Sequence, residues 1–160
     1  MKILVLSDTH LRRPGERLPD EVEKAAAAAD LIVHCGDMQT LSAYEYLRGL
    51  GRVVAVRGNT DEPALKKALP DRTVFEAAGR RIGVVHGWGA PWGLAGRVAA
   101  LFSGVDAVLF GHSHRPQREV RNGVLLFNPG SPTDRLFAPY NSYGILEVGP
   151  QEMKAHIVRI

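Results

Sequence analysis

Five short segments of this chain contain side chains that commonly bind metal ions. They are Asp8-Thr9-His10, Gly36-Asp37, Gly58-Asn59, His86-Gly87 and Gly111-His112-Ser113-His114. The seven candidate ligands are Asp8, His10, Asp37, Asn59, His86, His112 and His114. Seven ligands suffice for two metal ions that share one bridging ligand. A single such segment is usually structural, but five in succession indicate one site.

Two divalent ions held together would perform a recognisable kind of chemistry. Ions about 3.5–4 Å apart lower the pKa of a shared water and generate hydroxide near neutral pH. The same ions bind phosphoryl oxygens and offset the charge that develops at phosphorus. The ligand set therefore indicates phosphate ester hydrolysis that needs no serine or cysteine nucleophile.

Each segment follows an apolar run that is typical of a β-strand. The runs are residues 2–6, 31–35, 52–57, 82–85 and 107–110. Ligands of open α/β sheets bind beyond the carboxyl ends of the strands. We therefore expect the five segments to converge in space, although Asp8 and His114 are far apart in sequence.

The remaining elements complete an α/β pattern. Helices are predicted at 20–29, 40–50, 63–69 and 94–102, with Thr40 capping the second. Further strands are predicted at 73–78, 117–121, 124–128, 142–148 and 152–159, and Asn122-Gly123 is a strong hairpin signal. The early β-α-β-α-β order favours parallel pairing, and the later hairpins favour antiparallel pairing. Mixed sheets flanked by helices are therefore expected.

Composition limits the classes of function. The chain has 160 residues, of which 45% are hydrophobic, so residues 1–160 are most simply one domain. The formal net charge is +3, but the basic residues are scattered, which predicts no dedicated nucleic-acid surface. The single cysteine excludes an intrachain disulfide. No apolar run has the length of a membrane helix and no signal-peptide core opens the chain, so we expect a cytoplasmic protein without a membrane partner.

The five segments in order, followed by Asn128-Pro129-Gly130-Ser131, resemble the calcineurin-like metallophosphoesterase family, and within it the small YfcE-type phosphodiesterases. The resemblance covers essentially the whole chain. It implies a four-layer αββα sandwich of two mixed β-sheets flanked by helices, with the metal site at the C-terminal ends of the strands. It also implies a dinuclear metal-dependent phosphodiesterase that hydrolyses small phosphodiesters through a metal-bridging hydroxide.

The resemblance assigns roles to the candidate ligands. Asp8, His10 and His114 would hold the first metal ion. Asn59, His86 and His112 would hold the second, and Asp37 would bridge both. Asp37, Asn59 and His112 would also be catalytic. Mn²⁺ is the ion expected first, with Ni²⁺, Fe, Zn²⁺ or Mg²⁺ left open, because mixed nitrogen and oxygen ligation does not select one ion sharply.

Two positions depart from the family pattern. Thr60 stands where many members carry a histidine, and its hydroxyl is a poor proton donor at neutral pH, so we expect weak activity on alkyl monoesters. Trp88 stands where relatives often carry a second histidine. Trp88 and Trp92 could stack on a nucleobase, but packing of their loop against the core is the preferred interpretation.

Substrate contacts are predicted from Arg12, Asn59 and Thr60. Arg12 follows His10 in a loop and could clamp a phosphate, although Arg57 and Arg115 flank other segments and remain alternatives. The other polar candidates have structural interpretations. His34 is expected in the core, His156 on the surface, Cys35 as a small buried hydrophobe and Asp61 as a supporting or capping group.

Alternative functions stay open. A phosphomonoesterase or nucleotidase would use the same centre, and Thr60 argues against it. A non-catalytic protein-interaction scaffold is the other alternative, because the retromer subunit of this family uses the fold in that way. The predicted partner is a small phosphodiester or nucleotide-like substrate, and a homo-oligomer, dimer or tetramer, remains open.

Overall fold

The computed structural model describes residues 1–160, which form ten strands and four helices. The strands are β1 (Lys2–Leu6), β2 (Leu31–His34), β3 (Val53–Ala55), β4 (Arg72–Ala77), β5 (Arg80–Val85), β6 (Ala107–Leu109), β7 (Gln117–Arg121), β8 (Val124–Asn128), β9 (Ser142–Val148) and β10 (Met153–Arg159). The helices are α1 (Asp20–Ala27), α2 (Leu41–Leu50), α3 (Pro63–Ala68) and α4 (Leu94–Ala99). No helix combines the length and the apolar character needed to cross a membrane.

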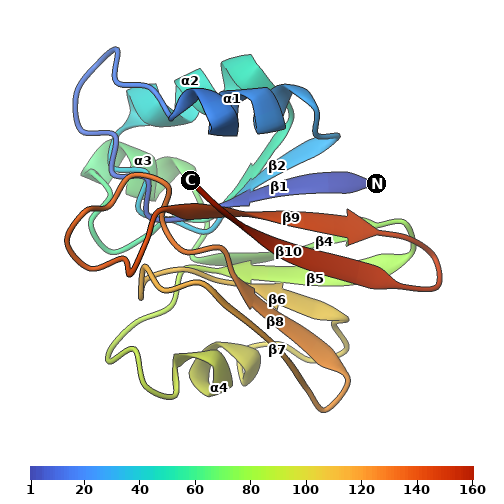
Figure 1. Ribbon diagram of the computed structural model, residues 1–160. Helices are drawn as coiled ribbons and strands as arrows, with labels where there is room; N and C mark the ends of the chain where they lie inside the picture. Colours follow the sequence, from blue (N-terminus) through green and yellow to red (C-terminus); the bar gives the residue numbers. More distant parts are fainter.

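The strands form two mixed five-stranded sheets. The first has the order β10-β9-β1-β2-β3, and its β1, β2 and β3 are parallel. The second has the order β4-β5-β6-β8-β7, and its β5, β6 and β8 are parallel. Because the parallel strands of each sheet end at the same edge, the loops that follow them gather at one end of the molecule (Figure 1).

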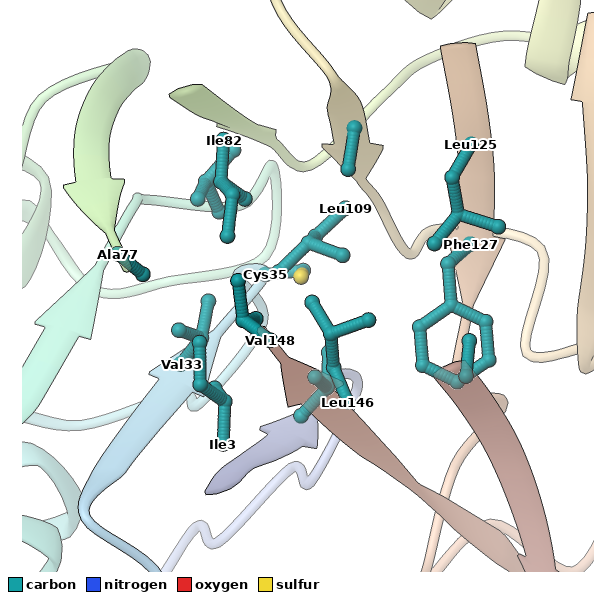
Figure 2. Close-up of a cluster of buried hydrophobic side chains, with 14 of the residues drawn as sticks. Ile3, Val33, Cys35, Ala77, Ile82, Leu109, Leu125, Phe127, Leu146 and Val148 are labelled. Atoms are coloured by element: carbon teal, nitrogen blue, oxygen red, sulfur yellow. The ribbon is translucent and has the colours of Figure 1, made fainter. Parts of the chain in front are cut away.

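Three clusters of apolar side chains fill the spaces between four layers of helices and sheets. The largest contains 16 buried residues and lies between the sheets, where Val33 and Cys35 face Ile82 and Leu109 (Figure 2). A second cluster packs the first sheet against α1, α2 and α3, and a third packs the second sheet against α4. The order helices, sheet, sheet, helix is visible in Figure 1 and confirms the αββα sandwich of mixed sheets.

Local signals placed most elements accurately. The hairpin has the predicted bounds, and Asn122 (φ 52°) and Gly123 (φ 79°) adopt the left-handed conformations that its two-residue turn requires. Thr40 Oγ1 accepts a hydrogen bond from Ala43 N and caps α2, as predicted. The predicted helix at 94–102 is wrong at its end, because α4 stops at Ala99 and the chain continues through turn hydrogen bonds such as Leu101 N to Val98 O.

Candidate metal centre

The pairing of β1 with β2 brings the first three candidate ligands, Asp8, His10 and Asp37, close together. In β1 and β2 the register runs from Ile3 opposite Leu31 to Leu6 opposite His34, and the pairing continues beyond both strands. Asp8 N donates to Gly36 O at 3.0 Å, and His10 N donates to Asp37 O at 3.0 Å. The two loops therefore leave the sheet side by side.

The second sheet is joined to these loops through its own strand ends. Gly111 N donates to His86 O at 3.0 Å, which aligns the segments after β5 and β6. His112 N donates to Asp8 Oδ2 at 3.0 Å, and Ser7 Oγ donates to the same oxygen at 2.7 Å. Asp8 thus links the two sheets, and the centre lies between them at their common edge.

One group of ligand atoms consists of Asp8, His10 and His114, whose atoms all lie within 4.8 Å of one another. His114 Nε2 is 3.3 Å from Asp8 Oδ1 and 3.4 Å from His10 Nε2. This is the set that the resemblance assigned to the first metal ion.

A second group consists of Asp8, Asp37 and His86. His86 Nε2 is 3.3 Å from Asp37 Oδ2 and 3.1 Å from Asn59 Oδ1. His112 Nδ1 also lies 3.1 Å from Asn59 Oδ1. All seven predicted ligands are therefore brought together, and Asp8 belongs to both groups, which the sequence did not indicate.

Each of the four histidines is oriented by a group outside the centre. His10 Nδ1 lies 2.6 Å from Gln39 Oε1, and His114 Nδ1 lies 2.6 Å from Asp134 Oδ2. His86 Nδ1 donates to Cys35 O at 2.8 Å, and His112 Nε2 donates to Gly89 O at 2.9 Å. Because an oxygen acceptor holds the outer N–H, the other ring nitrogen faces the centre and can bind a metal ion in its deprotonated form, as in metal-ligating histidines.

The burial and charge of the centre fit divalent cations. Asp8 is fully buried, Asp37 and His86 are almost so, and Asp8 Oδ1 is a buried oxygen with no hydrogen-bond partner. Buried carboxylates and converging nitrogen lone pairs are costly unless a cation compensates them. The donor set of imidazole, carboxylate and amide suits Mn²⁺, Fe, Ni²⁺ and Zn²⁺.

The pKa values of Asp37 and His114 reflect the same burial and the same neighbouring charges. Burial raises the pKa of Asp37, but hydrogen bonds and charge from His86 outweigh it and hold that pKa below its usual range. Burial lowers the pKa of His114, whereas the Asp8 and Asp134 carboxylates raise it to about 9. Positive charge is thus strongly favoured at this point of the structure.

Five candidate ligands have a left-handed backbone, which is uncommon for residues other than glycine. Their φ angles are 54° at Asp8, 45° at His10, 58° at Asp37, 68° at His112 and 56° at His114. This conformation costs roughly 1–2 kcal/mol per residue. Such strain gathers at functional sites, where the surrounding structure imposes it.

Gly58 and Gly111 are needed because other segments of the centre lie very close to their backbones. A Cβ on Gly58 would overlap Asp37 Oδ1, and a Cβ on Gly111 would overlap Ser7 Oγ beside Asp8. These two glycines therefore let the backbone of one loop touch the carboxylate of another.

With this geometry in place, comparison with known proteins identifies the family. The model of the calcineurin-like phosphoesterase superfamily domain matches residues 1–151. The chain belongs to the calcineurin-like phosphoesterase superfamily. The family resemblance read from the motifs is confirmed, and membership implies divalent metal ions at the centre.

Two curated relatives support the assignment to this superfamily. A probable metallophosphoesterase from Methanocaldococcus jannaschii is 40% identical over 136 residues, covering 83% of this chain and 69% of the relative. A probable metallophosphoesterase from Methanothermobacter thermautotrophicus is 33% identical over 162 residues, covering 99% of this chain and 92% of the relative.

Solved structures share the superfamily fold. A protein from Thermotoga maritima is 32% identical with a TM-score of 0.75 and 99% of both chains covered. Vps29 from Entamoeba histolytica, solved as a single mutant, is 24% identical with a TM-score of 0.76, covering 100% of this chain and 99% of the other. An archaeal phosphodiesterase is 24% identical with a TM-score of 0.73, covering 99% of this chain and all of the other.

Sequence reasoning missed several residues that support this superfamily site. Asp134 accepts from His114 and also from the backbone N–H groups of Leu136, Phe137 and Ala138. Ser131 Oγ donates to Asp8 O at 2.8 Å. Ser131 belongs to Asn128-Pro129-Gly130-Ser131, which had entered only as part of the family resemblance, whereas no motif marked Asp134.

Predicted substrate contacts lie around an open cavity of about 740 Å³. Arg12, Asn59 and Thr60 all line it, together with His10 and His114. Arg57 lies elsewhere, and its Nε donates to Asp71 Oδ1 at 2.5 Å. Arg12 is thus better placed than Arg57 to meet a group in this cavity.

The expectation that Trp88 and Trp92 pack their loop against the core is wrong. Trp88 is 48% exposed and Trp92 is 81% exposed. The loop is instead held by Arg97, whose guanidinium donates to the carbonyl oxygens of Trp88 and Trp92 at 2.9 and 2.8 Å. Polar bonds thus fix the backbone of this loop, and both indole rings lie largely at the surface.

The structural interpretations of the other polar residues are confirmed. His34 is fully buried and lies 3.0 Å from Thr9 Oγ1, while Gly36 N donates to its Nδ1. His156 is exposed and Cys35 is buried between the sheets. Asp61 accepts from Gln39 N and Gly58 N, so it supports two loops of the centre.

Proposed function

We propose that this protein is a dinuclear metal-dependent phosphodiesterase that hydrolyses small phosphodiesters. The observation that carries the proposal is the orientation of the four histidines. Each has its outer ring nitrogen held by an oxygen acceptor, so that its inner nitrogen faces the other candidate ligands. A structural histidine cluster would not need this common orientation.

In the proposed centre, Asp8, His10 and His114 hold one ion. Asn59, His86 and His112 would hold the other, and Asp37 would bridge both. When bound, the ion pair would activate a water near neutral pH and offset charge on the phosphoryl oxygens. We propose Mn²⁺ first, with Ni²⁺, Fe, Zn²⁺ and Mg²⁺ as alternatives.

Side chains of this chain would position the ester. Thr60 N donates to Asp37 Oδ1 at 2.9 Å, which keeps the Asp37 carboxylate in place while the Thr60 side chain lines the cavity. Arg12 lines the same cavity and would contact a phosphoryl oxygen. Asn59 and His112 would serve both the ion and the reacting phosphate, because they lie between the second group and the cavity.

The absence of a histidine at position 60 favours diesters with good leaving groups. A threonine hydroxyl does not titrate near neutral pH, so it supplies little general acid catalysis to a poor alkoxide leaving group. We therefore propose phosphodiesterase activity above phosphomonoesterase or nucleotidase activity.

The test compares two esters under controlled metal content. Chelator-stripped protein is assayed with bis-p-nitrophenyl phosphate and with p-nitrophenyl phosphate after adding back Mn²⁺, Ni²⁺, Zn²⁺ or Mg²⁺. We expect metal-dependent cleavage of the diester and little cleavage of the monoester. Cleavage of neither ester with any of these ions would contradict the proposal.

A variant tests the role of position 60. Thr60→His should raise monoester hydrolysis relative to diester hydrolysis, whereas Thr60→Ser, which keeps a hydroxyl, should not. An unchanged ratio in Thr60→His would remove the argument for diester preference.

A protein-interaction scaffold is the second candidate function. It is favoured by exposed apolar side chains, namely Leu136 and Phe137 at the cavity beside the centre and Trp92 in the loop that follows His86-Gly87. The fold is also shared with the vacuolar protein sorting protein Vps29. Intact metal binding without hydrolysis of either ester would favour this candidate. A homo-oligomer is a further proposal, which light scattering of the purified protein would test.

A further inference from the structure

A second cavity, of about 860 Å³, opens beside the proposed metal centre. Asn59 lines both this cavity and the one that contains Arg12 and Thr60. His86 also lines the second cavity. A group in this cavity would therefore be next to the proposed reacting centre and still outside the ligand set.

The walls of this cavity carry an excess of positive charge. Arg57, Lys66 and Arg72 line it, with Asp71 as the one carboxylate among the lining residues outside the metal centre. Asp71 is paired with Arg57 and its side chain is 76% exposed, so solvent screens much of its charge. Two cations thus remain uncompensated by a neighbouring acid within the cavity.

Two of the cations are held in place by the backbone. Lys66 Nζ donates to Asn59 O at 2.6 Å, and Arg57 Nη1 donates to Lys66 O at 2.8 Å. An ammonium group has three hydrogens, so Lys66 can bind a further acceptor. Positioned cations bind anions with a smaller loss of side-chain entropy than flexible ones.

Arg72 completes the cavity from the second sheet. It pairs with Val85 in the β4–β5 register, and Val85 immediately precedes His86. Its guanidinium makes no side-chain hydrogen bond in the structure. A planar guanidinium in this position is suited to bidentate binding of a phosphate.

We propose that this cavity binds a second phosphate group of the substrate. The preferred substrate would then be a phosphodiester in which one organic group carries another phosphate, as in derivatives of a phosphorylated nucleoside. This inference rests on the proposed phosphodiesterase function, because it assumes that the reacting diester lies at the metal centre.

Trp88 gives the same cavity a flat apolar wall. Its side chain is half-exposed, and its carbonyl oxygen is held by Arg97. Such a wall can contact a ring that joins the two phosphates. Loss of the indole should weaken binding whether or not the second phosphate is present, which separates its role from that of the cations.

The experiment uses two substrates that differ by one phosphate. Thymidine 5′-(p-nitrophenyl phosphate) and its 3′-phosphorylated counterpart have the same reacting diester and release the same p-nitrophenol. With the metal-loaded protein, the 3′-phosphate should lower KM about tenfold, as expected for charge-assisted hydrogen bonds. The preference should fall as salt is added.

Matched variants test where the second phosphate binds. Arg72→Gln should bring the KM ratio of the two substrates close to one. Arg52→Gln removes the same charge from an exposed residue just before β3, at the opposite end of that strand from Asn59, and should keep the ratio. Trp88→Ala should raise both KM values and keep their ratio.

The outcomes separate this inference from the proposed function. Cleavage of both thymidine substrates with equal KM would overturn the inference and leave the phosphodiesterase intact. If Arg72→Gln and Arg52→Gln reduced the KM ratio of the two substrates equally, the inference would also be overturned. The overall charge of the protein would then be the cause of the preference for the second phosphate. Failure to cleave even bis-p-nitrophenyl phosphate would count against the proposed function itself.

Discussion

The proposed metal centre and the surface around it reverse the usual distribution of polar and apolar side chains. Asp8 is 0% exposed and Asp37 is 3% exposed, whereas nearby Trp92 is 81% exposed and Leu136 is 78% exposed. Carboxylates normally lie in water and large apolar side chains normally lie in the core. The centre and its surroundings are therefore both arranged at a cost to stability.

The two regions differ in how firmly their side chains are held in place. Apart from Asn59, each candidate ligand in the centre is held by an outer hydrogen bond or has a strained backbone, so few replacements fit. In the apolar rim, meaning Trp92, Leu136 and Phe137, polar bonds hold the backbone, since Leu136 N and Phe137 N donate to Asp134 and Trp92 O accepts from Arg97, and only the Phe137 ring also packs against His114. The centre should thus be sensitive to small chemical changes, and the Trp92 and Leu136 side chains of the rim should tolerate them.

The largest expected effect comes from removing one buried charge. Asp37→Asn keeps the shape of the side chain, but a neutral amide cannot compensate two cations. We expect kcat for bis-p-nitrophenyl phosphate to fall roughly 10³-fold or more at saturating metal. Asp20→Asn, at an exposed carboxylate in the first turn of α1, is the matched control and should keep full activity. Full turnover by Asp37→Asn would show that this carboxylate is not a bridging ligand.

Metal removal should reveal the cost of the buried carboxylates. Metal at about 100 times its Kd stabilises the folded protein by about 2.7 kcal/mol, which raises Tm by roughly 5–10 °C for a chain of this size. Differential scanning fluorimetry with and without chelator measures this shift. Asp8→Asn should reduce the shift, whereas the rim variant Trp92→Ser should keep it. An equal Tm of the wild type with and without chelator would contradict the proposal of a metal centre.

A smaller effect is expected from the residue that orients His114. Asp134→Asn keeps an oxygen acceptor for His114 Nδ1 and removes the negative charge. Changes of this kind cost roughly 10- to 100-fold in metal affinity or activity. Calorimetric titration with Mn²⁺ measures the affinity, and Asp71→Asn, at an exposed carboxylate, should bind as the wild type does. Equal affinity in Asp134→Asn and the wild type would limit Asp134 to a role in its turn.

The smallest effect concerns pH and the buried His34. Burial lowers the pKa of His34 to about 3, below its ordinary value of 6.5. Below pH 6.5 the unfolded chain therefore takes up a proton that the folded chain does not. The stability that neutral His34 contributes above pH 6.5 is then lost as pH falls toward 3. Between pH 7.5 and 5.5 the loss should be about 1.4 kcal/mol.

The control for this pH effect is another histidine in the same sheet. Denaturant unfolding of the metal-free protein at both pH values would give the loss of stability. His34→Gln should remove this part of the pH dependence, and His156→Gln, at an exposed position on β10, should keep it. Equal pH dependence in His34→Gln and the wild type would show that His34 is not the responsible group.

Much of the fold and the set of candidate ligands could be predicted from local sequence. Alternating or continuous apolar runs located all ten strands, and Asn122-Gly123 and Thr40 marked a hairpin and a helix start. Asp8, Asp37 and the four motif histidines could also be predicted as candidate metal ligands, because they lie in the short segments that follow the strands. Local signals work here because strand ends, turns and caps depend on a few neighbouring residues.

Other features were decided only by tertiary structure. The inward nitrogen of His112 is Nδ1 because Gly89 O, from a different loop, holds Nε2. Asp134 reaches His114 across 20 positions of sequence, and Asp8 contacts both sheets. Arg97 holds the carbonyl oxygen of Trp92, whose ring stays exposed. Sequence alone therefore determined which groups are available and at which strand ends. The packing of two sheets determined which atoms of those groups meet, because contacts between distant segments have no local signal.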